Sequence, residues 1–469
     1  MILGIDVGTT SVKVCIYCPK QKKIVARQAK DTQANVPSEL GCEGNKQNPP
    51  KICSALHACV SRLPKDILKQ VTCIGVCGQM HGVMLWSYSN SDSQYDDGQP
   101  WQKSDNDSSR FDVNPDKVSS LYTWQDNRCD PEFLAALPKP QSHLRACSGY
   151  GCTTLFWFAK NRPEKLEKFN CAGTIQDFVV AMLCNLKKPI MSVQNAASWG
   201  YFDTSSSQWN LEILESAGFP VIFLPEVIQS GALAGNLSEI WHGIPAGTPV
   251  VSALGDLQCS VLSALHHEDD AVLNISTSAQ LSFIAPNFDP QSLNERANME
   301  FVPYFNGKYL AVAASLNGGN ALATFISTLQ QWSLELGSSL PQSTLWERSI
   351  QSASKCQTSS LNVSPKLLGE RHAPNELASV SNINPGNLSL GHVFRAICAG
   401  IVKNLYSIMP RSVLVENNIS RILGIGSALS RNQVLQEEVK SLYQLPIVFE
   451  GKGDAALGAA LATLLMSEH

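Results

Sequence analysis

The chain has 469 residues, of which 44% are hydrophobic, and its 36 basic and 40 acidic side chains give a formal net charge of −4. This length exceeds what one hydrophobic core usually organises, so two domains are expected. The sequence has no long basic run, which argues against a nucleic acid partner. No apolar run reaches the roughly 18 residues that a membrane span requires, so no membrane association is expected.

The 15 cysteines are odd in number and scattered, and most of them lie in apolar runs. We therefore expect buried free thiols in a reducing compartment, which predicts a cytoplasmic protein. Cys15 and Cys18 have CxxC spacing, but no second pair lies nearby, so neither a zinc site nor a redox site is expected there.

The first elements in chain order are two apolar strands, Ile2–Val7 and Val12–Tyr17, which are joined by a Gly/Thr/Ser turn. This pattern predicts a β-hairpin. Asp6 is unusual because it interrupts the apolar pattern just before the turn. The simplest interpretation is that its carboxylate accepts hydrogen bonds from the turn amides.

A second interpretation explains more of the hairpin. Successive turn amides and hydroxyls bind anions, and a nearby lysine adds a positive charge. A carboxylate next to bound phosphate requires a divalent cation between them, and Mg²⁺ is bound by few carboxylates and several waters. The candidate magnesium residue is Asp6, and the candidate phosphate residues are Gly8, Thr9, Thr10 and Lys13.

Two polar segments in the first half have the composition of a polyol site. Gln79, Met80 and His81 follow an apolar strand at a glycine-bounded end, and Trp124–Arg128 combines an aromatic face with charged groups. Such sites use a stacking surface and a few polar groups. The alternatives are that His81 is a structural histidine and that Asp126 and Arg128 form a surface pair.

Helical patterns alternate with strands in both halves, which indicates an α/β fold. The expected helices are Glu164–Lys168, Phe178–Cys184, Ala321–Leu336, Leu390–Met409 and Asn432–Leu442. Residues Ser87–Ser120 are rich in Ser, Asp, Asn and Gln. We expect them to form a long, partly disordered surface insertion.

A second strand–turn–strand pattern occupies Ala271–Phe283, and its turn again carries Ser and Thr. Two similar hairpins, one early in each half, predict a duplicated architecture. We place the domain boundary near Gly247, with domains at 1–247 and 248–469. In this arrangement Thr277 would bind phosphate from the side opposite to the first hairpin.

Three further positions near glycine turns are candidates. Asp256 follows an apolar strand and suits the base of a phosphoryl transfer, although Asp is also common as a helix N-cap. The segment Leu423–Asn432 has the pattern of a strand, a glycine turn and a helix, and the turn at Gly318 precedes another helix. Glycines permit close approach of a ligand to the backbone, but ordinary β–α turns have the same pattern.

Together these segments resemble the FGGY family of carbohydrate kinases, in the expected order along nearly the whole chain. The matching segments are Asp6–Lys13, Gly78–Gly82, Trp124–Arg128, Gly255–Gln258, Asn274–Ser278, Leu368–Pro374 and Gly424–Asn432. The resemblance implies a two-domain actin/hexokinase/Hsp70-like fold, which is a duplicated ribonuclease H-like fold with an active site between the domains.

The resemblance also implies the role of each candidate. It makes Asp256 the catalytic base and Asp6 the magnesium residue, with ATP and Mg²⁺ as cofactors. ATP would contact Gly8, Thr9, Thr10, Lys13, Thr277, Gly318, Gly426, Ser427 and Asn432. The sugar would contact Gln79, Met80, His81, Trp124, Asp126 and Asp256.

Longer stretches, such as Gly151–Trp157 and Gln194–Tyr201, resemble a branch of the family that acts on a seven-carbon ketose. This implies ATP-dependent phosphorylation of sedoheptulose to its 7-phosphate, a reaction that feeds the pentose phosphate pathway. No protein partner is expected. Xylulose, ribulose or glycerol kinases of the family remain alternatives, and a non-catalytic sensor of ATP or sugar is a more distant one.

Overall fold

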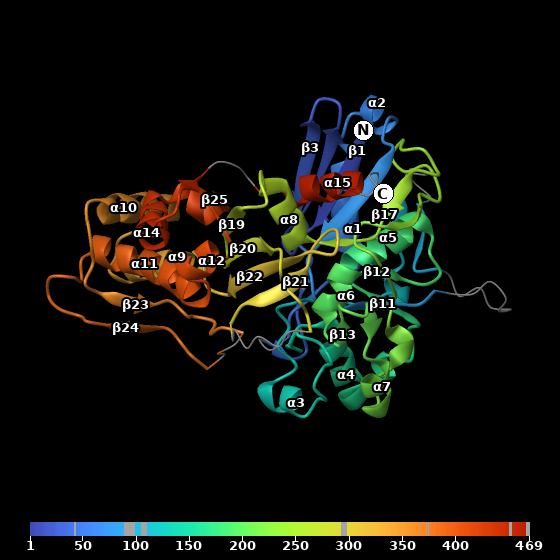
Figure 1. The fold of residues 1–469 in the computed structure, drawn as a ribbon, viewed down its shortest axis with the longest axis horizontal. Helices are drawn as coiled ribbons and strands as arrows, with labels where there is room; N and C mark the ends of the chain where they lie inside the picture. Colours follow the sequence, from blue (N-terminus) through green and yellow to red (C-terminus); the bar gives the residue numbers. More distant parts are fainter. Residues whose placement is uncertain are drawn as a thin grey trace.

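A computed structural model describes residues 1–41, 44–88, 99–104, 110–291, 298–371, 373, 375–449 and 453–465. Two β-sheets form the centres of two α/β lobes (Figure 1). The first sheet has the order β16 (Leu233–Asn236), β17 (Pro249–Val251), β6 (Cys73–Gly78), β1 (Ile2–Val7), β2 (Ser11–Cys18) and β3 (Lys23–Asp31), with β18 (Leu254–Gly255) also on β6. The second has the order β21 (Glu300–Pro303), β22 (Tyr309–Ser315), β20 (Ala279–Ala285), β19 (Asp270–Ile275), β25 (Arg421–Ile425) and β26 (Ile447–Val448).

The two sheets share one topology. In the first, β1, β2 and β3 are antiparallel, and β6 and then β17 join the other side of β1 as parallel strands. In the second, β19, β20 and β22 are antiparallel, and β25 and then β26 join β19 in the same way. The duplication that the two hairpins predicted is therefore confirmed.

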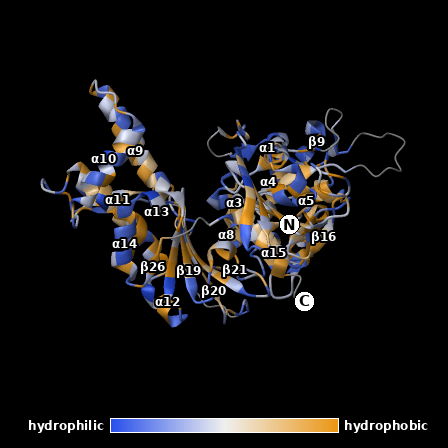
Figure 2. Cartoon of the chain, turned by 90° about the horizontal axis from the view of Figure 1, so that it is seen from above, coloured by the Kyte–Doolittle hydropathy of each residue, from blue (hydrophilic) through white to orange (hydrophobic). Residues whose placement is uncertain are grey.

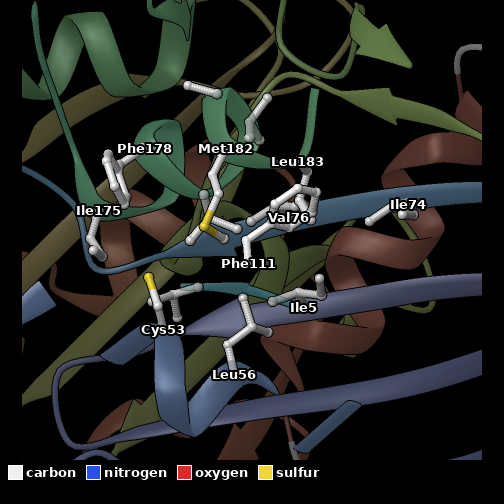
Figure 3. Packing of buried hydrophobic residues seen from close by; sticks show 14 of the residues in the cluster. Ile5, Cys53, Leu56, Ile74, Val76, Phe111, Ile175, Phe178, Met182 and Leu183 are labelled. Carbon is white, nitrogen blue, oxygen red and sulfur yellow. The ribbon is translucent and has the colours of Figure 1, made fainter. Parts of the chain in front are cut away.

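Helices cover both sheets and form the cores with them. The long helices of the first lobe are α1 (Pro49–Ser61), α4 (Gly151–Asn161) and α5 (Ile175–Cys184). Figure 3 shows Phe178 and Met182 of α5 packed above Ile5 and Val76 of the first sheet. A fully buried side chain of this size contributes about 1.5–3 kcal/mol. The second lobe has α9 (Gly319–Glu335), α10 (Gln342–Ser354), α11 (Leu390–Ile408) and α14 (Gln433–Tyr443), of which α9 and α10 project outward (Figure 2).

Helix α15 (Ala455–Leu465) comes late in the chain but packs on the first sheet, next to α8 (Asp256–Ala264) (Figure 1). Glycines make this contact possible, because a Cβ at Gly4 would lie 1.9 Å from the carbonyl oxygen of Ala456. A Cβ at Gly75 would lie 2.1 Å from that of Ala459. Both halves of the sequence thus build the first lobe. The boundary near Gly247 stays a prediction.

Two expectations were wrong in part. Residues 164–168 do not form an α-helix; the chain makes only a 3₁₀ turn at Pro163–Lys165. The expected polar insertion contains the paired strands β8 (Trp101–Lys103) and β9 (Phe111–Val113), and Trp101 and Phe111 are buried in the core of the first lobe. Residues 89–98 and 105–109 of that insertion, for which disorder was expected, lie outside the described residues.

The cysteines in the described ranges are free thiols, and most of them are buried. None of the helices described here combines the length and apolar character needed to cross a membrane.

Candidate active site

A cleft of about 1660 Å³ lies between the two lobes and is lined by residues of both. A pocket for one drug-sized ligand has about 300–1,000 Å³, so this cleft has room for two ligands. The predicted residues that form its wall are Asp6, Gly8, Thr9, Thr10, Lys13, Trp124, Asp256, Thr277, Gly426 and Ser427. Those that do not are Gln79, Met80, His81, Asp126, Gly318 and Asn432.

Asp6 is a buried carboxylate at the end of β1, directly opposite Lys13 of β2. Lys13 Nζ lies 3.4 Å from Asp6 Oδ2, and Asp6 Oδ1 is buried without a hydrogen-bond partner in the described part of the chain. Burial raises the pKa of Asp6, and the neighbouring lysine opposes this rise. A buried carboxylate oxygen with a free lone pair at the wall of the cleft fits a divalent cation or its water ligand.

The turn after Asp6 is held from outside the hairpin. Gly8 N–H donates to Ser11 O at 3.1 Å, and the Thr9 hydroxyl accepts a hydrogen bond from Trp124 Nε1 at 3.0 Å. Gln47 Nε2 donates to Thr9 O at 2.7 Å. Because Thr9 only accepts from Trp124, its hydroxyl proton is left for a ligand. Trp124, predicted as a stacking surface, also positions this turn.

The turn between β19 and β20 faces the same cleft with neutral groups. Thr277 is exposed at its tip. Ser276 Oγ donates to Asn274 Oδ1 at 3.1 Å and accepts from Ser427 N–H at 3.3 Å. Ser276 thereby connects this hairpin to the glycine turn that starts α13 (Ser427–Arg431).

The glycines at the second lobe have different functions. Gly426 has φ +100° and lines the cleft, and a Cβ there would lie 2.4 Å from Ile275 O. A Cβ at Gly318 would lie 2.4 Å from the carbonyl carbon of Ser278, and its N–H already donates to Asn320 Oδ1 at 2.8 Å. Gly318 therefore allows close packing of the second hairpin and does not itself face the cleft.

Asn432, predicted to contact adenosine, is buried and caps α14. Its Oδ1 accepts from the N–H groups of Val434 and Leu435 at 3.1 and 3.3 Å. Its Nδ2 lies 3.5 Å from the sulfur of Cys398. The residues just before Asn432 that do line the cleft are Ser430 and Arg431.

Asp256 lines the cleft as the first residue of α8, and its Oδ1 accepts from Leu257 N–H at 2.8 Å. Desolvation in the cleft and the negative charge of Asp6 raise the pKa of Asp256 to about 7. A carboxyl group with this pKa exchanges protons near neutral pH, as a general base requires. The helix N-cap interpretation fails here, because the N-cap position belongs to Gly255.

The segment at residues 79–81, which was predicted to bind a polyol, is anchored in the first lobe. Gln79 Nε2 donates to Gln47 Oε1 at 3.0 Å, and Gln79 Oε1 is buried without a described partner. Met80 packs next to Gly255, the residue before the candidate base. His81 has φ +74°, and its Nδ1 donates to Ser198 O at 2.9 Å.

Burial and the charge of Arg371 lower the pKa of His81 to about 3, so its imidazole is neutral. Because Nδ1 carries the proton, Nε2 is a hydrogen-bond acceptor.

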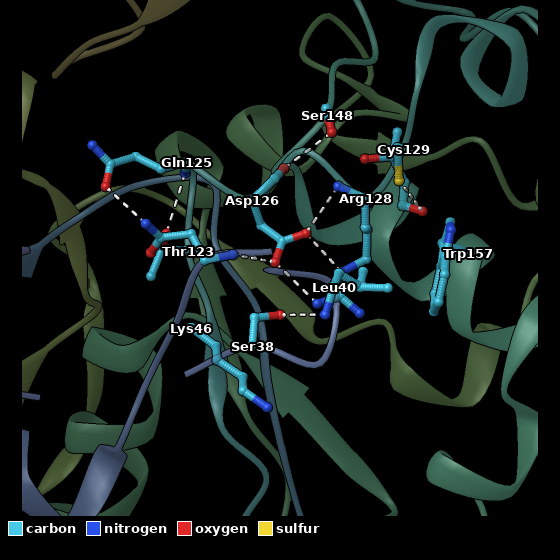
Figure 4. Close-up of polar contacts among 12 residues, drawn as sticks. Ser38, Leu40, Lys46, Thr123, Gln125, Asp126, Arg128, Cys129, Ser148 and Trp157 are labelled. Carbon is cyan, nitrogen blue, oxygen red and sulfur yellow. Dashed lines mark hydrogen bonds and ion pairs between the residues drawn. The ribbon is translucent and has the colours of Figure 1, made fainter. Parts of the chain in front are cut away.

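Asp126 is not available to a ligand. Its side chain is fully buried, with Oδ1 at 2.6 Å from Arg128 Nε and Oδ2 at 2.9 Å from both Arg128 Nη2 and Asn45 N (Figure 4). The expected surface pair is thus a buried, bidentate one. It fixes the loop that carries Trp124 and Gln125 to the cleft.

Sequence reasoning missed two residues near His81, Arg371 and Tyr150. Arg371 lines the cleft from the second lobe, and its Nη1 lies 3.3 Å from the hydroxyl of Tyr150 in the first lobe. Tyr150 stacks on His81, with ring centroids 4.4 Å apart. The segment Leu368–Pro374 was included in the family resemblance, but nothing in its pattern indicated that the arginine reaches across the cleft.

The family model for the N-terminal domain of the FGGY family of carbohydrate kinases matches residues 1–94 and 105–263. The sedoheptulokinases of Mus musculus and Homo sapiens are each 48% identical to this chain over 98% of its length and 97% of theirs. The xylulose kinase of Rhodospirillum rubrum superimposes with a TM-score of 0.78 at 16% identity, over 99% of this chain and 89% of that one. The chain therefore belongs to the FGGY family of carbohydrate kinases.

Proposed function

We propose that the protein transfers the γ-phosphoryl group of ATP to the terminal hydroxyl of sedoheptulose, giving sedoheptulose 7-phosphate. The observation that carries this proposal is the 48% identity to two sedoheptulokinases, which extends over almost the full length of this chain and of each relative. The cleft supports it, because it has room for a nucleotide and a sugar, and residues from both lobes line it.

In this proposal Asp256 accepts the proton of the attacking hydroxyl. The pKa of about 7 supports this role, since the ionised form is available at neutral pH and still accepts a proton readily. The amides and hydroxyls of Gly8, Thr9 and Thr10 would bind the ATP phosphates from one side, and Thr277 from the other. Gly426 and Ser427 would receive the adenosine end.

Asp6 would hold Mg²⁺ through its unpartnered Oδ1, directly or through water. When bound, the cation would neutralise negative charge on the phosphates of ATP. Lys13 would orient the Asp6 carboxylate through their contact at 3.4 Å.

The acceptor would lie in the cleft beside Trp124, and its contacts with the segment Gln79–His81, which lies outside the cleft wall, would form when the lobes close. The neutral His81 offers Nε2 to a sugar hydroxyl. For Asp126 we propose a positioning role only, because Arg128 and Asn45 occupy both of its oxygens. Closure of the lobes would exclude water from the γ-phosphate and limit ATP hydrolysis.

The test is ADP release with ATP and Mg²⁺ against sedoheptulose, xylulose, ribulose and glycerol. We expect the highest kcat/KM with sedoheptulose. If another polyol is preferred, the substrate assignment is wrong and the kinase assignment stands. ATP binding without ADP release on any of the four would instead support a sensor.

A further inference from the structure

We infer that Arg371 recognises the acceptor sugar from the second lobe, by donating hydrogen bonds to sugar oxygens at the end remote from the transferred phosphoryl group. This inference rests on the proposed function, since it assigns a further contact in the same site. It is carried by four observations about this arginine.

The first is that the backbone at Arg371 is fixed to the second lobe. The preceding residue, Glu370, is 1% exposed. Its carboxylate accepts from Ser315 Oγ at 2.6 Å, Leu316 N–H at 3.0 Å, Asn317 Nδ2 at 3.0 Å and Asn404 Nδ2 at 2.7 Å. A buried carboxylate with four donors holds its segment rigidly. Arg371 thus extends into the cleft from a fixed base.

The second is the direction in which the side chain extends. Its guanidinium carbon lies 5.7 Å from the centroid of the Tyr150 ring, and Nη1 lies 3.3 Å from the Tyr150 hydroxyl. Tyr150 stacks on His81 with an interplanar angle of 7°. The arginine of one lobe therefore contacts Tyr150 of the other lobe, and Tyr150 in turn contacts His81 of the proposed sugar segment.

The third is the number of donors that remain. A guanidinium has five N–H groups. Within the described ranges, the hydrogen bond to Tyr150 is the only one that Arg371 donates from its side chain, and no carboxylate forms an ion pair with it there. Its other nitrogens are not enclosed, because Arg371 lines the cleft. A partly buried cation with open donors at a ligand cleft is suited to bind a ligand oxygen.

The fourth is that the charge of Arg371 acts on a different set of residues from the charges around Asp6 and Asp256. The charged groups that shift the pKa of Asp6 are Lys13 and Asp454, and those that shift the pKa of Asp256 are Asp6 and Lys13. Arg371 instead acts on Tyr150, Cys147 and His81. The donors of Arg371 and the acceptor atom Nε2 of His81 together match an open-chain ketose, which presents carbonyl and hydroxyl oxygens as well as hydroxyl protons.

The test compares wild type with Arg371→Met, which keeps the length of the side chain and removes its charge. We expect the KM for the ketose, and its Kd measured by calorimetry without ATP, to rise about 10- to 100-fold, the usual effect of losing a charge-assisted hydrogen bond. The KM for ATP should change less than about twofold. Arg371→Lys keeps the charge without the planar donors, so its values should lie between the two.

The matched control is Arg431→Met, which removes a cleft arginine at the nucleotide end. It should raise the KM for ATP and leave the Kd for the ketose unchanged. The inference is overturned if Arg371→Met leaves the ketose Kd unchanged, or if its KM for ATP rises as much as that for the ketose. An equal rise in the two KM values would mean that the substitution disturbs the whole cleft and not sugar recognition alone, and the inference would then be wrong.

Failure of the proposed function would be visible in the wild type, as turnover of xylulose or ribulose in place of sedoheptulose. The Arg371 comparison would then be made with that ketose and would still decide the inference. A wild-type protein that binds no ketose would overturn both.

Discussion

Beside its turn, the β1–β2 hairpin carries a carboxylate and an ammonium group on the paired residues Asp6 and Lys13, whereas the β19–β20 hairpin carries two amides, Asn274 and Gln280, beside a turn with hydroxyl side chains. Both hairpins occupy the same place in sheets of the same topology. The duplicated fold thus supplies two similar backbone turns, and the side chains make them different. The first hairpin has a carboxylate that would suit a cation, whereas the second hairpin has only neutral hydrogen-bonding groups beside its turn.

The second hairpin also has a connection that the first lacks. Ser276 joins it to the turn at Ser427, so a ligand that moves one turn would move the other. The first hairpin is instead supported by Trp124 of the first lobe, which donates a hydrogen bond to Thr9. One turn is thereby coupled to the end of the cleft that we propose for the nucleotide, and the other to the end that we propose for the sugar.

The largest expected effect concerns Asp256, the carboxylate that lines the cleft between the two hairpins. Asp256→Asn should lower kcat by about 100-fold or more, because general-base terms are usually 10²–10⁴. In the wild type, kcat/KM should fall as the pH decreases below about 7, since burial and Asp6 raise the pKa of Asp256 and its protonated form accepts no proton. Steady-state rates from pH 5.5 to 9 measure both. Near-normal turnover by the variant would remove Asp256 from this role.

A smaller effect should distinguish the hairpins by metal dependence. Asp6→Asn should raise the Mg²⁺ concentration for half-maximal activity about tenfold or more, as loss of a metal-site partner commonly does. Asn274→Ala, on the other hairpin, is the matched control and should leave the Mg²⁺ titration unchanged. Equal shifts in both variants would contradict the assignment of the cation to the first hairpin.

The smallest effect should come from the neutral turn. Thr277→Val removes one hydroxyl, which is worth about 0.5–1.5 kcal/mol in a net hydrogen bond, so the KM for ATP should rise about two- to tenfold. Thr277→Ser retains the hydroxyl and should remain close to wild type. A KM for ATP that does not change in Thr277→Val would mean that this turn binds phosphate through its backbone alone.

The hairpins, the strand before Asp256 and most helices were predictable because their patterns are local. The Asp6 hairpin, for example, follows from two apolar runs around a glycine turn. Failures arose where tertiary packing decides. Trp101 and Phe111 were assigned to a polar insertion because their neighbours are polar, yet both are buried. The composition of a segment does not indicate whether two of its aromatic side chains are buried in the core.

The same reason explains why the sequence did not predict the surroundings of two candidate site residues. Asp126 and Asn432 lie in the right motifs, but the sequence does not tell whether a polar side chain faces the cleft or the protein. A buried arginine binds the carboxylate of Asp126, and the N-terminus of α14 donates hydrogen bonds to the side chain of Asn432. Arg371 was missed for the opposite reason, because only the arrangement of the lobes brings it to Tyr150.

The position of α15 has a consequence for how the protein folds during synthesis. Cys77 of the first sheet donates a hydrogen bond from its thiol to the carbonyl of Ala455, which is 378 positions away in the sequence. The apolar face that α15 covers on β1 and β6 must therefore stay exposed on the nascent chain until the ribosome has made almost all of the second lobe. Contacts of such sequence separation slow folding, and a polypeptide that stops before residue 455 would leave this face open to chaperones and to aggregation.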